Sequence, residues 1–340
     1  MTSAIIEYAR LLRLPGLGGL SMAPVFGALS VAATTPVDVV HLIIIFFIGS
    51  LSAIYGFVLN DIVDVNIHKL CKDLGNRPLV KGTVPVTHAK IICVSVFVLA
   101  FVIIFWFFYQ PTVTFYLALA SIIASAITGT LYNFYGKRFM GSDILVALSE
   151  AFLVLFGAFL ILPALTPSIF TWIIAILTFN QLLYMNAIEG GLKDADHDYL
   201  MNVKNIALVT GVKVVGKHKL IIPKSFQILG FSIRLVSSAL VFVPFVFFNE
   251  PIDGPNLILL GLLVLGVLVT SEQFLRMKTF DRNTVRKRIV RQTFLRYSIV
   301  PIMLIPLTGG IMALGLILFP LLWYIVFTPL VGGTLFKPEM

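Results

Sequence analysis

The chain has few charged residues, and this excludes most soluble folds. Asp, Glu, Lys and Arg make up 12% of its 340 residues, whereas apolar residues make up 59%. Soluble domains carry about 25% charged residues, and the mean hydropathy of this chain is +1.00. Its two cysteines, Cys71 and Cys93, have no metal-binding spacing and give no reason to expect a disulfide. No cleavable signal pattern is present at the N-terminus, where Arg10 and Arg13 simply precede the first apolar stretch.

Apolar stretches dominate the sequence instead. A membrane-spanning helix needs about 20 mostly apolar residues. Stretches of that kind lie near 17–34, 39–63, 88–108, 112–131, 143–163, 168–188, 226–248, 256–275 and 298–327. The last is long enough to tilt, or to bend at Pro306 or Gly309-Gly310. The sequence therefore predicts an all-α polytopic membrane protein with nine transmembrane helices.

Lysine and arginine are absent from every second loop between these stretches. The basic residues gather at the N-terminus and after the second, fourth, sixth and eighth spans. This alternation follows the positive-inside rule. It places the N-terminus and the basic loops on the cytoplasmic side of the cell membrane. Topology thus accounts for the net charge of +9, and we expect membrane lipid and no nucleic acid as a partner.

Two acidic clusters stand at the ends of apolar stretches. Asn60, Asp61 and Asp64 follow the second span, and Asp194 and Asp198 follow the sixth. Carboxylates near hydrocarbon are costly, so they usually face a cavity and mark a functional site. Solvated helix ends are the alternative, but both clusters are predicted at helix C-termini, where the helix dipole disfavours anions. A divalent cation between the clusters, most simply Mg²⁺ shared with substrate phosphates, would remove that penalty.

The position of the clusters suggests a weak internal repeat. Spans one to four and five to eight form comparable blocks, each with its acidic cluster after the second helix. If the blocks pack pseudo-symmetrically, the clusters face one another across a central cavity. The long polar segments 66–87 and 189–225 directly follow the clusters. We expect them to form cytoplasmic caps of a single domain, residues 1–340.

Basic and neutral polar residues accompany the acids. The basic residues would suit a diphosphate, because its oxygens both coordinate Mg²⁺ and accept paired hydrogen bonds from a guanidinium. They are Arg77, Lys193 and the pair Lys137-Arg138. Tyr132 and Asn133, at the end of the fourth span, could add neutral hydrogen bonds. A diphosphate at the membrane surface with its tail in an apolar cavity describes an isoprenyl diphosphate.

These motifs resemble the signatures of the UbiA superfamily of intramembrane aromatic prenyltransferases. Asn60-Asp61-Ile62-Val63-Asp64 followed by Asn76-Arg77-Pro78 is similar to its first motif, N-D-x-x-D-x-x-x-D then R-P. Lys193-Asp194 through Asp198, followed by Gly211, resembles the second, D-x-x-x-D, and Leu131-Tyr132-Asn133 with Lys137-Arg138 resembles the motif between them. His68 stands where the first motif has its third acid. Whether His68 ligates metal, donates a hydrogen bond or does neither stays open.

The resemblance implies a mechanism. Two Mg²⁺ ions, held by Asn60, Asp61 and Asp64 on one side and by Asp194 and Asp198 on the other, would bridge the diphosphate and stabilise charge as the allylic C–O bond ionises. The basic residues would stabilise the same charge. A lipophilic or aromatic acceptor would capture the carbocation. Quinone precursors, a prenylated glycerol phosphate and haem are all used within the family, and the motifs do not decide among them.

Other polar residues interrupt the apolar spans. Glu150 is predicted to face the bundle interior, either in a helix–helix hydrogen bond or on a cavity wall. Asn180 and Gln181 are more typical of interhelical contacts, and Arg234 is close enough to a helix end to extend towards water. Gly190-Gly191 would allow either a helix break or a close helix contact.

Two rival functions are compatible with acidic clusters in a membrane protein. A CDP-alcohol phosphotransferase also uses clustered aspartates and metal, but its acids normally lie in one compact motif with associated glycine and arginine, which is missing here. A secondary transporter would place its ion site near the bilayer midplane, whereas both clusters here lie at one face. Prenyl transfer is therefore favoured.

Overall fold

The computed structural model describes residues 2–32, 35, 37–69, 75–136, 138–162, 165–200, 203–216 and 218–333. Within these residues, seven helices are long and apolar enough to cross a membrane. They are α4 (Val39–Val63), α7 (Val86–Phe108), α8 (Val113–Tyr135), α9 (Asp143–Ile161), α10 (Ile169–Leu183) continued by η2 (Tyr184–Gly190) and α11 (Gly191–Lys193), α16 (Gly254–Leu275) and α20 (Gly310–Leu330). The all-helical prediction is thus confirmed.

The remaining two predicted spans fall on broken helices. Stretch 17–34 is covered by α2 (Leu14–Leu20) and α3 (Ala23–Leu29), and stretch 226–248 by α14 (Lys224–Leu240) and α15 (Val243–Phe247). Pro24 and Pro244 lie in the first turn of α3 and α15. Proline lacks an N–H and its ring clashes with the preceding turn, so it is tolerated in a first turn but not inside a helix. Proline thus explains why the described residues contain seven rather than nine unbroken spans.

The predicted bend of the last span is present. Two short helices, α18 (Ile299–Met303) and α19 (Ile305–Thr308), precede α20. Pro306 lies in the first turn of α19. Gly309 connects α19 to α20 with φ of 80°, a conformation that favours glycine.

Two glycines let α3 and α9 pack backbone to backbone. A Cβ on Gly27 would lie 1.9 Å from the Val154 carbonyl oxygen, and one on Gly157 would lie 1.8 Å from the Pro24 carbonyl oxygen. Small residues permit this close approach between helices in membranes. The largest apolar cluster, which includes Phe156 and Phe170, forms around this crossing. The crossing therefore fixes the centre of the bundle.

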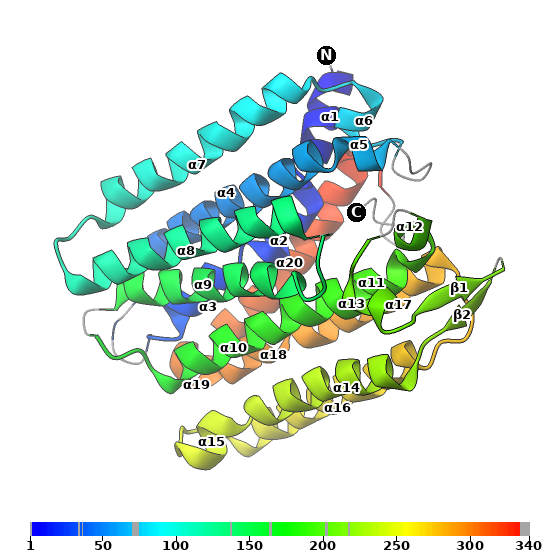
Figure 1. Cartoon of the computed structure of the whole chain (residues 1–340). Coiled ribbons are helices and arrows are strands. Elements are labelled where there is room, and N and C mark those ends of the chain that lie inside the picture. The colour runs from blue at the N-terminus through cyan, green and yellow to red at the C-terminus, as the bar shows by residue number, and fades with distance from the viewer. Residues whose placement is uncertain are drawn as a thin grey trace.

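Short elements gather at one end of the bundle (Figure 1). They are α1 (Thr2–Leu11), α5 (Val65–His68), α6 (Pro78–Lys81), α12 (Ala195–Leu200), α13 (Ile206–Val209) and the hairpin β1 (Lys213–Val215) and β2 (Lys219–Ile221). The hairpin pairs Lys213 with Ile221 and Val215 with Lys219, and Lys219 also bridges to Thr279 before the basic helix α17 (Arg282–Tyr297). The elements α15 and α19 lie at the opposite end (Figure 1). Described parts of both acidic clusters and of both predicted caps therefore share one end.

Candidate active site

The first acidic cluster is buried where α4 ends. Asp64 is the C-cap of α4, and its amide donates to the Asn60 carbonyl at 2.9 Å. Asp61 and Asp64 are only 4% and 5% exposed. The Asn60 side-chain amide donates to Asp64 Oδ2 at 3.4 Å. This cluster therefore stands at a helix C-terminus, as predicted, with its carboxylates inside the protein.

Two arginines neutralise Asp61. Arg77 Nη1 donates to Asp61 Oδ1 at 2.5 Å, and Arg13 Nη2 donates to the same oxygen at 3.0 Å. The Arg13 guanidinium also lies over the Phe57 ring, 4.7 Å from its centroid. Arg13 has a positive φ of 49°, which is uncommon for a residue with a Cβ. From the sequence alone, Arg13 is interpreted only as a residue that marks the cytoplasmic side. Its isolated charge before the first span gave no further signal.

Arg77 connects the two clusters electrostatically. Burial is the main cause that lowers the pKa of the Arg77 guanidinium, and the positive charge of Arg13 lowers it further. The carboxylates of Asp61, Asp64 and Asp194 all raise the same pKa. Acids from both clusters therefore act on the charge of Arg77, and Asp61 contacts it directly.

The second cluster is divided between two helix ends. Asp194 is the C-cap of α11 and lies 3.5 Å from Lys193 Nζ. Asp196 and Asp198 instead lie in the first turn of α12, where the helix dipole favours anions. The prediction that this whole cluster sits at a helix C-terminus is therefore wrong for Asp198. A new helix starts one residue after Asp194.

Polar partners missed in the sequence hold the second cluster. Asn205 Nδ2 donates to Asp198 Oδ2 at 2.6 Å, while Asn205 Oδ1 caps α13 by accepting from the Leu208 amide. Arg282 forms an ion pair with Asp196 at 2.8 Å. Asn205 follows the cluster closely in sequence and could have been suspected. Arg282 lies far along the chain, and nothing in the sequence connects it to Asp196.

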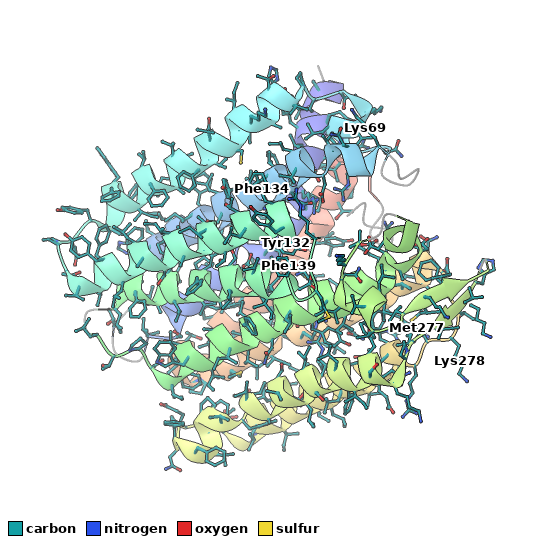
Figure 2. All side chains as sticks on the ribbon, in the orientation of Figure 1. Lys69, Tyr132, Phe134, Phe139, Met277 and Lys278 are labelled. Carbon is teal, nitrogen blue, oxygen red and sulfur yellow. The ribbon has the colours of Figure 1, made fainter. Side chains whose placement is uncertain are left out.

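The motif between the clusters lies beside a cavity. Tyr132 donates its hydroxyl to Asn186 Oδ1 at 3.4 Å, and the Asn133 side-chain amide donates to the Gly56 carbonyl at 3.3 Å. Figure 2 places Tyr132 in the middle of the molecule. Arg138 is exposed over the Tyr135 ring, 5.5 Å from its centroid.

Two predicted site residues lie outside the described part. Lys137 is not among the described residues, and the description of His68 extends to its backbone in α5 but not to its side chain. Their predicted contacts with a diphosphate remain predictions.

The cavity has a volume of about 230 Å³ and lies among α4, α7, α8, α9 and the α10–η2 helix. Its polar lining includes Arg13, Asn60, Tyr132, Asn133 and Glu150, and much of its remaining wall is apolar, including Leu51, Val96, Phe97, Phe101 and Leu153. Of the two alternatives for Glu150, the cavity wall is the one observed. A polar mouth with an apolar interior suits a molecule with an anionic head and a hydrocarbon tail.

The donor set does not form a finished metal cage. Among the described residues, no group of three or more His, Cys, Asp and Glu side chains is close enough to hold an ion. Mg²⁺ is commonly bound through one or two carboxylates together with substrate phosphates and waters. Two pairs of aspartates fit an ion that arrives with a diphosphate better than an ion bound by the protein alone.

Comparison with known proteins identifies relatives along most of the chain. The profile of the UbiA prenyltransferase family matches residues 21–299. A digeranylgeranylglyceryl phosphate synthase from Saccharolobus solfataricus is 23% identical over 262 residues, which cover 74% of this chain and 89% of that protein. A 4-hydroxybenzoate octaprenyltransferase from Francisella tularensis is 28% identical over 198 residues, covering 57% of this chain and 65% of the relative.

Solved structures share the fold. A digeranylgeranylglyceryl phosphate synthase superposes with a TM-score of 0.62 at 18% identity, covering 93% of this chain and 99% of that one. A UbiA homologue from Archaeoglobus fulgidus bound to GPP and Mg²⁺ superposes with a TM-score of 0.61 at 15% identity, covering 89% and 99% of the two chains.

Proposed function

This chain belongs to the UbiA prenyltransferase family and is an integral membrane protein, and we propose that it transfers a prenyl group from an isoprenyl diphosphate to a lipophilic or aromatic acceptor. The diphosphate binds between the two acidic clusters, and the isoprenyl tail occupies the cavity. The observation that carries this proposal is the position of Arg77. It contacts Asp61 and is influenced by Asp194, so it offers a guanidinium to an anion lying between the clusters.

Mg²⁺ is the divalent ion that fits these residues. Asn60, Asp61 and Asp64 would hold it on one side, and Asp194 and Asp198 on the other. When bound, the metal supplies positive charge to the diphosphate leaving group. The Archaeoglobus fulgidus homologue bound to GPP and Mg²⁺ supports this assignment.

Each basic residue has its own part in the site. Arg77 binds the diphosphate and stabilises the charge that develops on it, and Lys193, beside Asp194, does the same from the second cluster. Lys137 and Arg138, which follow α8 in the sequence, bind the diphosphate as well, and Arg138 leaves the Tyr135 ring to do so. Tyr132 and Asn133 contribute neutral hydrogen bonds at the mouth of the cavity. His68 is a possible further contact.

The reaction is a heterolysis followed by capture. The allylic C–O bond breaks, and its electron pair remains on the diphosphate oxygen. The acceptor attacks the carbocation and then loses a proton. Three aromatic residues on the cavity wall, Tyr55, Phe97 and Phe101, pack against each other, with ring centroids 5.7 Å and 5.0 Å apart. Aromatic faces stabilise a cation, and the apolar wall keeps water from the cation.

The topology follows from the basic loops. Nine crossings, with the two proline-broken segments each counted as one, place the N-terminus and both clusters at the cytoplasmic face of the cell membrane. Segments 66–87 and 189–225 cap the site within a single domain, residues 1–340. Crossings one to four and five to eight form the two pseudo-repeated blocks around the cavity. The common end of the described cap elements (Figure 1) supports this arrangement.

A coupled assay tests the function. The purified protein in detergent is incubated with Mg²⁺, geranyl diphosphate and one of two acceptors, 4-hydroxybenzoate or geranylgeranylglyceryl phosphate, which the names of the two relatives suggest. We expect diphosphate release that requires Mg²⁺ and a prenylated product with one acceptor. Release of cytidine monophosphate from a CDP-alcohol, with no reaction of geranyl diphosphate, would instead support the phosphotransferase alternative.

A further inference from the structure

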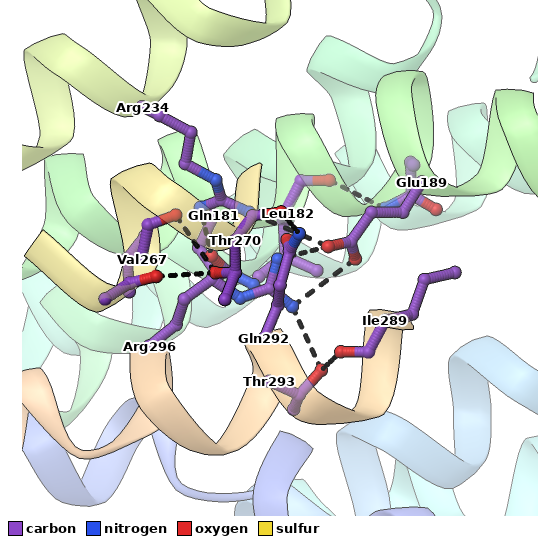
Figure 3. Close-up of polar contacts among 12 residues, drawn as sticks. Gln181, Leu182, Glu189, Arg234, Val267, Thr270, Ile289, Gln292, Thr293 and Arg296 are labelled. Atoms are coloured by element: carbon purple, nitrogen blue, oxygen red, sulfur yellow. Dashed lines mark hydrogen bonds and ion pairs between the residues drawn. The ribbon is translucent and has the colours of Figure 1, made fainter. Parts of the chain in front are cut away.

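A buried ion-pair network joins Glu189 to Arg234 and Arg296 (Figure 3), five residues before Asp194 in the sequence. Arg296 Nη1 and Nη2 donate to the two carboxylate oxygens of Glu189, the second at 3.3 Å. Arg234 Nη1 donates to Gln181 Oε1 at 2.8 Å, and its Nη2 lies 3.8 Å from Glu189 Oε1. Glu189, Arg234 and Arg296 are 1%, 3% and 7% exposed. The network therefore joins three helices in the interior of a membrane protein.

Glu189 is the only acidic group in this network. Two guanidiniums face one carboxylate, and Arg234 also stacks on Tyr184 with its Cζ 3.4 Å from the ring centroid. A buried charge without its partner is strongly destabilising, whereas a buried pair replaced as a whole is often tolerated. The network therefore depends on Glu189, which in turn fixes the backbone that carries it.

That backbone is the π-helix η2, and it connects three features. Met185 and Asn186 of η2 line the cavity, and Asn186 accepts a hydrogen bond from Tyr132. Glu189 of η2 forms the buried pair. The chain then passes through α11 to Asp194, whose amide donates to the Gly190 carbonyl at 3.0 Å. π-Helices are rare, and many of those that occur lie at functional sites. A side chain that maintains η2 therefore contributes to the site next to it.

The conformation of η2 sets the direction of the second cluster. If this segment were an ordinary α-helix, the residues after it would be shifted in register. A shift of one residue rotates the following side chains by about 100° around the helix axis. The next turn is tightly packed, because a Cβ on Gly191 would lie 2.6 Å from the Ala207 Cβ. Asp194 can therefore keep its position only while η2 keeps its extra residue.

Helix α17 holds this segment at two points. At its N-terminal end, Arg282 pairs with Asp196 at 2.8 Å and donates Nε to the Lys193 carbonyl at 3.4 Å. At its C-terminal end, Arg296 pairs with Glu189. The two arginines are 14 residues apart on one 16-residue helix. The segment between Glu189 and Asp196 is thus braced along its length by one helix.

We infer that Glu189 and Arg296 are positioning residues for the reaction: their ion pair maintains the π-helix and so holds Asp194 and Asp198 where the second cluster meets the diphosphate. This inference rests on the proposed function. It adds residues that contact neither substrate nor metal and that belong to none of the sequence motifs. Groups that orient metal ligands typically change metal affinity or activity about 10- to 100-fold when they are removed.

Equilibrium binding tests this inference. Titration calorimetry in detergent measures Mg²⁺-dependent binding of geranyl thiolodiphosphate, a non-hydrolysable analogue, to the full chain. For Glu189→Gln we expect Mg²⁺-dependent affinity about 10- to 100-fold weaker than in the parent, together with a lower melting temperature. Two controls separate position from stability. Glu272→Gln removes the exposed pair with Arg276, and Gln292→Leu removes a buried hydrogen bond from α17 to the Thr270 carbonyl that does not involve η2. Both should bind like the parent, although Gln292→Leu should melt earlier.

A double variant provides the sharper distinction. Glu189→Gln with Arg296→Met leaves one guanidinium of the network, Arg234, without its acidic partner, whereas Glu189→Gln leaves two. The melting temperature of the double variant should therefore lie between those of Glu189→Gln and the parent, while its Mg²⁺-dependent affinity stays weak. Parent-like affinity in a folded Glu189→Gln or double variant would show that the pair only stabilises the fold and would overturn the inference. Absence of binding by the parent would instead count against the proposed function, so the two failures are distinguishable.

Discussion

Arg77 is the residue through which the site is most easily tested, because it contacts an acid of the first cluster directly. It is half-buried beside Asp61 and Arg13, and desolvation by its surroundings is the main cause that lowers its pKa. An arginine stays charged despite such a shift, since its ordinary pKa lies far above neutral pH. A lysine in the same surroundings starts from about 10.4, so the same burial moves its pKa towards the range in which enzymes are assayed.

Arg77→Lys should therefore lose activity at alkaline pH. Burial disfavours the charged amine, so its pKa falls, and the charged form that binds diphosphate disappears as pH rises through that pKa. The pH–rate profile of the variant should decline at lower pH than that of the parent. Lys81→Arg, at an exposed position on α6, serves as a control. If the activities of Arg77→Lys and the parent declined at the same alkaline pH, residue 77 would not bind the diphosphate as a cation.

Glu150 is the acidic residue of the described cavity wall, and it makes no hydrogen bond to the described residues. Removing a carboxyl group from water without giving it a polar partner is costly, so we expect Glu150 to meet a polar group of the acceptor. Glu150→Leu should raise the acceptor KM about tenfold, the loss of one hydrogen bond to a charged group, and leave the KM for geranyl diphosphate unchanged. Glu150→Gln should lie between. Initial rates with each substrate varied in turn would check this, and an effect on the diphosphate KM alone would contradict it.

At the scale of elements, the crossing of α3 and α9 depends on two glycines. Gly27→Ala and Gly157→Ala place a Cβ within 2 Å of a facing carbonyl oxygen, so the helices must separate. We expect each variant to lose about 1–3 kcal/mol of stability, as overpacked cores do. Thermal unfolding in detergent measures this, with Gly261→Ala as the control because its Cβ would meet nothing within 4 Å. An unchanged melting temperature in Gly157→Ala would show that α3 and α9 accommodate the added methyl group without loss of stability.

The sequence predicted long helices better than broken ones. Seven spans follow from apolar length alone. The breaks at Pro24 and Pro244 depend on whether each proline starts a new helix or kinks a continuous one, and hydropathy does not distinguish these two cases. The π-helix η2 was also missed. Its sequence permits an α-helix, and what accompanies the wider turn is a salt bridge to Arg296, more than a hundred residues away.

Site residues were predicted where their residue type is unusual for its place in the sequence, and were missed where it is ordinary. Asn60, Asp61, Asp64, Asp194 and Asp198 stand out because acids are rare next to apolar stretches. Arg13 and Arg282 resemble ordinary positive-inside residues, since a basic residue near the membrane surface needs no further explanation. Their contacts with Asp61 and Asp196 appear only in three dimensions.

For the whole molecule, the basic loops predict one cytoplasmic face that carries both caps. Single-cysteine labelling tests this at Thr83 and at Lys213, both exposed, in a background with Cys71 and Cys93 replaced. Reagents confined to the cytoplasmic face should modify both sites, and Mg²⁺ with geranyl thiolodiphosphate should slow the modification because the caps close over the ligand. Labelling of either site from the outer face would contradict the topology. Rates unaffected by the ligand would contradict the caps alone.

The central claim is that both acidic clusters hold one diphosphate. Calorimetry with Mg²⁺ and geranyl thiolodiphosphate measures this directly on the parent and on Asp64→Asn, Asp198→Asn and Asp253→Asn. Asp253 caps the start of α16, shortly after α15, the element at the opposite end of the bundle (Figure 1), and its replacement should be silent. We predict saturable, Mg²⁺-dependent binding by the parent and by Asp253→Asn, and binding weakened at least tenfold by loss of either Asp64 or Asp198, since each cluster supplies part of the same site. Parent-like binding by folded Asp64→Asn or Asp198→Asn would contradict the shared site.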